Sequence, residues 1–232
     1  MKLSKRLLGI AKMVPQGAQV ADIGTDHALL PCYLIREKIA ARVIGVEIKK
    51  GPYQRANLNI SNYNLSSEIE LRLGDGLTVL KPREVDTVIL AGMGGSLICR
   101  LLEAAPQIVT GLKQIIVQPM NRAKLVRFWL AKEGWFFEAE DLLEENNHFY
   151  QIIKVGKKGA EINLSNLTAA YGPLLLTKKH PLLINLIETD LKRWQEIVGE
   201  LAKANSKVAK KRAQVYQKRI QQLKKLLDCL KA

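Results

Sequence analysis

The chain has 232 residues, 47% of them hydrophobic, which is enough for a folded core and excludes a disordered chain. Lysine and arginine exceed the acids by 36 to 22, and the net charge of +14 favours an acidic partner, nucleic acid first, over an inert basic surface. No apolar run reaches the roughly 18 residues of a membrane span and no signal-peptide pattern follows the N-terminus, so we expect a cytoplasmic protein with no membrane partner.

Residues 1–156 alternate short apolar runs with helical stretches such as Tyr53–Tyr63 and Gly95–Ala104. This alternation predicts an α/β fold whose parallel sheet is covered by helices on both faces. The last two runs are separated only by the acidic stretch Glu140–Asn147, which is too short for a helical crossover and predicts a closing antiparallel hairpin. The seven predicted strands are Gln19–Ile23, Val43–Val46, Ile69–Leu73, Thr87–Ala91, Gln114–Gln118, Trp135–Ala139 and Phe149–Val155.

Strand patterns end at Gly156–Gly159, which has the composition of a linker, so we expect two domains, residues 1–156 and residues 160–232. Residues 164–177 predict one helix that Pro173 ends or kinks. Two longer helices follow, interrupted at Asn205-Ser206, and the spacing of their apolar residues predicts an antiparallel, coiled-coil-like hairpin. The seam can pack within one chain or between two, and the break at Asn205-Ser206 favours packing within one chain and therefore a monomer. The seam residues are Leu183, Ile187, Trp194, Ile197, Leu201, Ala209, Ala213, Tyr216, Ile220, Leu223, Leu227 and Leu230.

The last helix is strongly basic, with ten lysines and arginines between Lys203 and Lys231 against Asp228 alone. A solvated outer face is the simpler interpretation of a charge run. The extreme bias towards one sign instead favours binding to a phosphate backbone, independent of base sequence and sensitive to salt. The candidate contacts are Lys207, Lys210, Lys211, Arg212, Lys218 and Arg219.

The first strand ends in Asp22, and the loop that follows contains Gly24, Asp26 and His27. The second strand is followed by Glu47, at the point where a carboxylate can accept hydrogen bonds from a ribose diol. The loop lacks the G-x-G-x-x-G pattern that wraps a pyrophosphate. Its acids suit a ligand with a positive centre, such as S-adenosylmethionine (SAM). The alternative is an ordinary strand-to-helix turn that Asp26 or His27 caps.

Three later loops carry further candidates at the ends of predicted strands. Asp75 lies between Gly74 and Gly76, where an acid can accept a hydrogen bond from an adenine amine, although Asp-Gly is also common in surface turns. The glycine-rich loop Ala91-Gly92-Met93-Gly94-Gly95 exposes backbone where substrate and cofactor should meet, or is merely flexible. The amides of Gln118 and Asn121 can read the polar edge of a base, or only shape their loop.

Taken together, these motifs resemble the TrmK family of bacterial tRNA methyltransferases, which methylate N1 of the adenine at tRNA position 22 with SAM. The matching strings are DIGTDHALLP at Asp22–Pro31, GDGL at Gly74–Leu77, AGMGG at Ala91–Gly95 and QPMN at Gln118–Asn121, with the opening Leu3–Leu7. The resemblance implies a class I SAM-dependent methyltransferase fold, which is a Rossmann-like seven-stranded sheet with its last strand antiparallel, followed by a helical appendage.

The resemblance also implies roles for individual residues. Asp26 corresponds to a functionally important acid of the family and is the candidate catalytic residue, in chemistry or in positioning. The implied cofactor contacts are Asp22, Gly24, Asp26, His27, Glu47, Gly74, Asp75, Gly76, Ala91, Gly92, Met93, Gly94 and Gly95.

Other interpretations remain open at this stage. One is a methyltransferase for a different RNA site, and another is a non-catalytic tRNA-binding protein with the same fold. A third is an NAD-dependent oxidoreductase, which shares Glu47 but needs a phosphate-binding loop. Three scattered cysteines and three histidines lack the paired spacing of zinc ligands, so we expect no structural metal and no disulfide framework.

Overall fold

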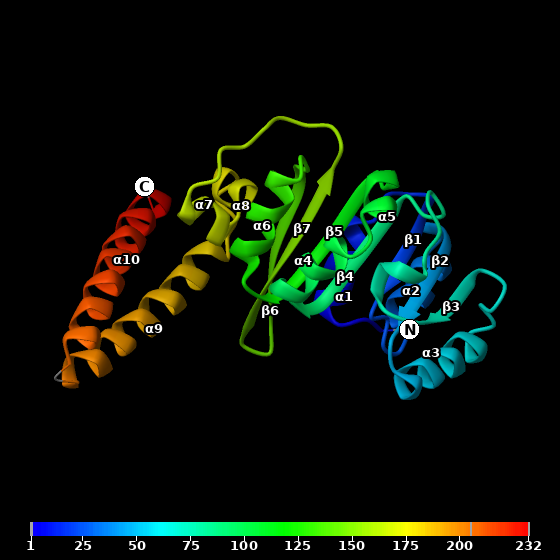
Figure 1. Ribbon diagram of the computed structural model, residues 1–232, viewed down its shortest axis with the longest axis horizontal. Helices are drawn as coiled ribbons and strands as arrows, with labels where there is room; N and C mark the ends of the chain where they lie inside the picture. Colours follow the sequence, from blue (N-terminus) through cyan, green and yellow to red (C-terminus); the bar gives the residue numbers. More distant parts are fainter. Residues whose placement is uncertain (1, 205, 232) are drawn as a thin grey trace. The chain divides into compact units, whose positions relative to one another are not determined.

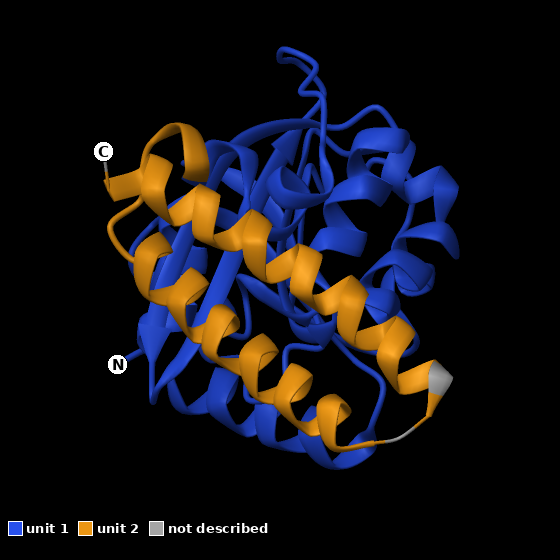
Figure 2. Cartoon of the chain, turned by 90° about the vertical axis from the view of Figure 1, so that its left-hand side faces the viewer, with its two compact units in different colours: residues 1–175 blue, residues 176–232 orange. Residues whose placement is uncertain are grey.

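The computed structural model describes residues 2–204 and 206–231, and the side chain of Lys207 lies outside the described part. The chain divides into two compact units, Met1–Leu175 and Leu176–Ala232 (Figure 2). The first unit contains the predicted sheet and the second contains two long helices. The two units are described separately below.

A single seven-stranded sheet forms the centre of the first unit, in the order β3-β2-β1-β4-β5-β7-β6 (Figure 1). Strands β1 to β5 pair in parallel, and β7 lies antiparallel between β5 and β6. The predicted class I methyltransferase sheet, with its antiparallel last strand, is therefore confirmed. The strands are β1 (Ala18–Ile23), β2 (Ala40–Glu47), β3 (Ile69–Leu73), β4 (Thr87–Gly94), β5 (Gln114–Asn121), β6 (Phe136–Glu145) and β7 (His148–Gly156).

Helices cover both faces of this sheet, as expected for buried parallel strands (Figure 1). Alternate residues of β1 separate the two cores: Val20 packs with the helices α1, α2 and α3, and Ala21 packs with η1, α4, α5 and α6. The bounds are α1 (Lys5–Met13), α2 (Leu29–Arg36), α3 (Lys50–Asn62), η1 (Gly76–Val79), α4 (Gly95–Glu103), α5 (Pro106–Gly111) and α6 (Ala123–Lys132).

The hairpin between β6 and β7 is tighter than the sequence predicts. Most of the acidic stretch expected as a connection belongs to β6, and only Asn146 and Asn147 form the turn. Both asparagines have positive φ, at 52° and 60°, which is the backbone conformation of a two-residue hairpin loop. Asp141, Glu144 and Glu145 of β6 are partly exposed, whereas Leu142 and Glu140 are buried, so most of the acids in this stretch lie at partly exposed positions of a strand.

The segment after β7 stays with the first unit, so the observed boundary lies later than the predicted linker. Arg127 Nη1 donates to the carbonyl of Ala169 at 3.0 Å, and Glu140 Oε2 accepts from the Leu174 amide at 2.8 Å. Arg127 and Glu140 form a fully buried ion pair with Nε to Oε1 at 2.6 Å. The predicted helix ends before Pro173, one of the two outcomes expected there, and the chain forms two short helices, α7 (Asn166–Tyr171) and α8 (Pro173–Thr177).

The second unit contains α9 (Leu183–Lys203) and α10 (Lys207–Lys231), which pack side by side (Figure 2). They run antiparallel, because Glu188 pairs with Lys231 while Trp194 stacks on Tyr216 with ring centroids 4.9 Å apart. The predicted seam residues of α10 are all at least partly buried, and its lysines are exposed wherever their side chains are described. Asn205, part of the predicted break, lies outside the described residues.

Candidate functional site

Two cavities meet at Gly24, at the edge of the sheet where the parallel strands end. The Asp75 cavity, of about 230 Å³, is lined by Ile23, Gly24, Gly74, Asp75, Gly76 and Met93, among others. The Arg6 cavity, of about 100 Å³, is lined by Arg6, Asp22, Gly24, Asp26, His27 and Ala91, among others. Ligands of open α/β sheets bind at this carboxyl edge. The structure therefore brings most of the predicted cofactor residues to one ligand-binding edge.

Gly24 lines both cavities, and a side chain there would require Met93 to move. Its φ is +73°, a left-handed conformation that glycine adopts at little cost, and a Cβ built there would lie 2.5 Å from Met93 Cε. The amides of Gly24 and Thr25 donate to the carbonyl of Val46 at 2.8 and 3.0 Å. The loop after β1 is thus fixed to the end of β2, which leaves bare backbone facing both cavities.

Asp22 lies at the inner wall of the Arg6 cavity and is almost completely buried. Thr25 Oγ1 donates to its Oδ2 at 2.7 Å. Burial raises the pKa of Asp22 from 3.8 to about 6, although the Thr25 hydrogen bond and the charge of Arg6 oppose this rise. A carboxylate that is costly to bury alone is well suited to a cationic ligand, which would stabilise its charged form.

Asp26 lies in the mouth of the same cavity with a side chain 62% exposed. Its carboxylate is 3.7 Å from the Arg55 guanidinium and 3.6 Å from His27 Nε2. Asp26 and Ala28 both have positive φ, at 50° and 53°, a conformation that costs a non-glycine residue about 1–2 kcal/mol. The surrounding loop maintains this strain, which is common where a functional side chain must point in a set direction.

Glu47 does not line either cavity, although its neighbours Val46 and Ile48 line the Asp75 cavity. Its buried carboxylate accepts hydrogen bonds from three backbone amides, those of Asp26 at 3.2 Å, Ile48 at 2.9 Å and Lys49 at 3.2 Å. The observed role of Glu47 is therefore to hold the loops after β1 and β2 together. Its carboxylate oxygens keep lone pairs beyond these three bonds, so a ribose contact stays a prediction.

Asp75 and its two glycines form one wall of the Asp75 cavity. The Gly74 amide donates to the Glu47 carbonyl at 2.9 Å, which ties the end of β3 to the end of β2. Gly76 has a φ of +58°, and a Cβ there would lie 2.6 Å from Leu101 Cδ2. Apolar side chains, among them Met93 and Leu101, complete a slot whose charged side chains are Asp75 and Arg100, which suits a flat, mostly apolar ring with an exocyclic amine for the carboxylate.

Gln118 and Asn121 are both engaged within the protein. Gln118 is completely buried; its Oε1 accepts from the Gly92 amide at 3.1 Å and from Arg6 Nη1 at 3.0 Å, and its Nε2 donates to the Pro119 carbonyl at 3.1 Å. Asn121 Oδ1 accepts from the Gly95 amide at 3.3 Å. Both side chains therefore fix the glycine-rich loop after β4. Gln118 is buried, whereas Asn121 is exposed and the hydrogen bond to Gly95 uses only its Oδ1, so a base contact of Asn121 stays a prediction.

The predicted phosphate contacts lie on α10 in the second unit. Lys210, Lys211, Arg212 and Lys218 are exposed, and the side chain of Lys207 lies outside the described residues. Arg219 is partly buried, with its guanidinium 4.9 Å from the centroid of the Trp194 ring. Stacking on an aromatic face leaves the donors of an arginine directed outward, so this contact is compatible with phosphate binding.

Sequence reasoning missed three arginines of the site. Arg100 lines the Asp75 cavity, Arg6 lines the cavity named after it, and Arg55 pairs with Asp26. The only signal for Arg6 is its place in the opening Leu3–Leu7, and Arg55 is one of two basic residues on a helix that carries no motif. Neither residue is close in sequence to the loop that it contacts.

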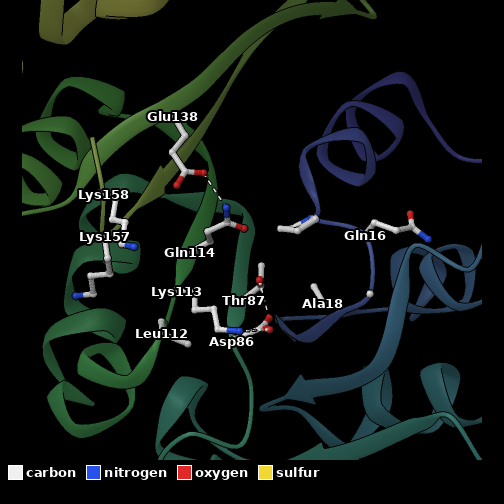
Figure 3. A pocket seen from close by; sticks show the side chains of 12 residues that line it. Gln16, Ala18, Asp86, Thr87, Leu112, Lys113, Gln114, Glu138, Lys157 and Lys158 are labelled. Carbon is white, nitrogen blue, oxygen red and sulfur yellow. Dashed lines mark hydrogen bonds and ion pairs between the residues drawn. The ribbon is translucent and has the colours of Figure 1, made fainter. Parts of the chain in front are cut away.

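A larger cavity, of about 540 Å³, lies at the opposite edge of the sheet, where β1, β4 and β5 begin (Figure 3). Its polar side chains are largely paired with one another: Gln114 Nε2 donates to Glu138 Oε2 at 2.8 Å, and Lys113 Nζ lies 3.4 Å from Asp86 Oδ2. This is the amino-terminal edge of the parallel strands, away from the loops that carry the predicted residues. The carboxyl edge is therefore the candidate site.

The described part of the chain contains neither a cluster of metal ligands nor a helix that could span a membrane. Over residues 2–204 and 206–231, no three histidine, cysteine, aspartate or glutamate side chains are grouped as metal ligands. Within the same ranges no helix combines the length and apolar character needed to cross a membrane.

Comparisons with known proteins agree with this geometry. Residues 3–153 match the family model described as a methyltransferase domain. A Bacillus subtilis (strain 168) protein named tRNA (adenine(22)-N(1))-methyltransferase is 38% identical over 208 residues, covering 88% of this chain and 87% of that protein.

Two solved structures extend the likeness over nearly the whole chain. The B. subtilis m1A22 tRNA methyltransferase TrmK is 34% identical, with a TM-score of 0.88 and coverage of 97% of this chain and 99% of that one. M. capricolum TrmK in complex with S-adenosyl-homocysteine (SAH) is 25% identical, with a TM-score of 0.86 and coverage of 99% and 100%.

Proposed function

The chain belongs to the TrmK family of tRNA (adenine(22)-N(1))-methyltransferases, and we propose that it transfers the methyl group of SAM to N1 of adenine 22 in tRNA. The observation that carries this proposal is the pair of cavities that meet at Gly24. One is a slot for a flat ring and the other is a small polar pocket, and SAM consists of an adenosine joined to an amino acid.

The residues of the Asp75 cavity fit the adenosine part of SAM. The Asp75 carboxylate is the acceptor for the adenine amine, and the glycines at positions 74 and 76 leave room for the ring. Glu47, at the end of β2, is the candidate for the ribose hydroxyls while it continues to hold the Asp26 loop. When bound, SAM supplies an electrophilic methyl group on a sulfonium.

The protein's task in the reaction is alignment rather than activation of the nucleophile. Adenine N1 has a free lone pair at neutral pH, so it can attack the methyl carbon without losing a proton first. The enzyme must then hold N1, the methyl carbon and the sulfur in line and away from water. We assign this positioning to Asp26, whose exposed carboxylate at the cavity mouth can accept a hydrogen bond from the adenine N6 amine.

The target edge of adenine 22 must be exposed before it can react, because N1 lies on the Watson–Crick edge. We assign binding of the tRNA phosphate backbone to the exposed cations of α10. We expect α9 and α10 to act together as a coiled-coil-like RNA-binding hairpin. A tRNA substrate also implies a cytoplasmic protein. The basic helix is in the second unit, so this assignment divides binding and chemistry between the two units.

Methylation of total tRNA with labelled SAM, followed by mass spectrometry of the nucleosides, tests the proposal. We expect 1-methyladenosine as the product. A different methylated nucleoside would support another RNA site. Binding of tRNA without any methyl transfer would support a non-catalytic protein of the same fold. Calorimetric titration with SAM and with NAD distinguishes a methyltransferase from an NAD-dependent oxidoreductase. We expect SAM to bind and NAD not to bind.

A further inference from the structure

The carboxylate of Asp26 lies between two basic side chains from different elements. Arg55, on α3, places Nη2 3.7 Å from Oδ1, and His27 places Nε2 3.6 Å from Oδ2. His27 lines the Arg6 cavity, whereas Arg55 lines neither that cavity nor the Asp75 cavity. Oδ1 of Asp26 is therefore turned towards α3, and Oδ2 lies on the side of the loop that borders the Arg6 cavity.

Helix α3 is also tied to the backbone of this loop. The Glu47 carboxylate that accepts from the Asp26 amide accepts in addition from the amide of the residue before α3. Asn59 Nδ2 donates to the carbonyl of His27 at 2.9 Å. Arg55 and Asn59 are four residues apart and so lie on one face of the helix. This face of α3 thus contacts both the backbone of the loop and the side chain of Asp26.

We propose that Arg55 is a positioning residue for methyl transfer, because it holds Oδ1 of Asp26 and leaves Oδ2 directed at the N6 amine of the target adenine. The proposal rests on the proposed function, and within it on the role assigned to Asp26. Arg55 acts through Asp26 and contacts neither the cofactor nor the base.

Asp26 needs this support because little else restrains its side chain. Its carboxylate is 62% exposed, and an exposed side chain without a partner samples several rotamers. Adenine N1 gains a positive charge on methylation, so a carboxylate fixed beside the base stabilises the transition state better than a mobile one. A displacement of about 1 Å in such a contact can lower a rate by up to about a hundredfold.

The exposure of the ion pair separates positioning from a structural role. The Arg55 side chain is 52% exposed, and ion pairs between exposed side chains contribute little to folding stability. Loss of Arg55 should therefore appear in the rate of methyl transfer and not in the stability of the protein. An exposed arginine can also bind an RNA phosphate, but that contact would change the affinity for tRNA instead of the rate at saturation.

Single-turnover methyl transfer at saturating SAM and tRNA tests the proposal, with the KM for tRNA and the affinity for SAH measured alongside. We expect Arg55→Gln to lower the rate by about tenfold, with the KM, the SAH affinity and the midpoint of denaturant unfolding unchanged. Arg55→Lys should recover part of the rate, because it keeps the charge. Lys50→Gln is the matched control, since it removes the same charge from an exposed position of the same helix, and it should change none of these quantities.

A double variant tests whether Arg55 acts through Asp26. Adding Arg55→Gln to Asp26→Asn should give a protein no slower than Asp26→Asn alone, because the carboxylate that Arg55 holds is already gone. A full rate for Arg55→Gln, or the same tenfold loss in the Asp26→Asn background, would overturn the proposal. So would a raised KM for tRNA with an unchanged rate, which would make Arg55 a phosphate contact. Failure of the unmodified protein to methylate tRNA would contradict the proposed function itself.

Discussion

The backbone N–H of Asp26 donates a hydrogen bond to Glu47 Oε2 at 3.2 Å, which joins the loop of the candidate catalytic residue to the end of β2. The other oxygen of Glu47 accepts from the amides of Ile48 and Lys49. One buried carboxylate therefore fixes two of the loops that border the cofactor cavities. The position of Asp26 depends on Glu47 whether or not Glu47 also contacts the cofactor.

Replacing Glu47 with glutamine should weaken both the fold and cofactor binding. The amide NH2 of glutamine cannot accept a hydrogen bond, so at least one backbone N–H in this buried turn loses its partner. We expect a loss of about 1–3 kcal/mol in the free energy of unfolding, and SAH binding weakened by at least about tenfold. Denaturant unfolding and calorimetry measure the two effects. Glu68→Gln, at an exposed position, should change neither.

Replacing Gly24 with alanine should weaken SAH binding by at least about tenfold, since Gly24 lines both cavities and the new Cβ, 2.5 Å from Met93 Cε, would displace the Met93 side chain that lines the Asp75 cavity. Gly17→Ala is the matched control: Gly17 has a nearly identical φ of +74°, with no atom within 4 Å of the added Cβ. Both variants should lose about 1–2 kcal/mol of stability from the left-handed backbone. Only Gly24→Ala should lose affinity for SAH. Equal SAH affinity in the two variants would show that no ligand passes Gly24.

Asp26→Asn should separate catalysis from folding. Asparagine tolerates a positive φ, so the loop should keep its shape while the carboxylate is lost. We expect the rate of methyl transfer to fall by about a hundredfold, with SAH affinity nearly unchanged. Single-turnover assays and calorimetry provide the two readouts, with Glu37→Gln as an exposed control. A fully active Asp26→Asn variant would eliminate Asp26 as a catalytic residue.

Asp22→Asn should stabilise the ligand-free protein at neutral pH. The pKa of Asp22 is raised from 3.8 to about 6 by burial, so the folded protein holds a proton on this group more tightly than the unfolded chain does. The stability of the unmodified protein therefore falls as pH rises from about 4 to about 6, by at most about 3 kcal/mol, and stays lower above that range. Asparagine does not titrate.

The advantage of Asp22→Asn in free energy of unfolding should thus grow between pH 4 and pH 6 and then remain constant. Denaturant unfolding across this range measures it. An advantage that does not vary with pH would show that Asp22 titrates at its ordinary pKa in the folded protein.

The exposed cations of α10 should set the salt dependence of tRNA binding. Exchanging Lys210, Lys211 and Arg212 for glutamine should reduce the slope of log affinity against log salt by about 1 for each residue that contacts a phosphate. Filter-binding or anisotropy titrations at several salt concentrations measure the slope. The control exchanges Lys12, Lys81 and Lys132, exposed cations that are spread over the first unit. An equal change in both triple variants would indicate an effect of net charge alone.

The sequence predicts the strands well because strands buried on both faces read as nearly continuous apolar runs, as in Val43–Val46 and Thr87–Ala91. It misplaces the turn between β6 and β7 because a run of acids within a strand, one of them buried in an ion pair with Arg127, has the composition of a loop. The direction in which a side chain points is harder still to predict from the sequence. Glu47 and Gln118 end the expected strands, yet backbone amides occupy their polar atoms. Arg6 reaches the site only through the packing of α1, which no local pattern reveals.

Site-resolved methylation of two tRNA transcripts that differ only at position 22 tests the central claim most directly. One transcript has adenine there and the other has guanine, and nuclease fragments are located by mass spectrometry after incubation with the protein and SAM. The account predicts a single added methyl group at N1 of adenine 22 in the first transcript and none in the second. Equal methylation of both transcripts, or a methyl group at another nucleotide of the first, would contradict it.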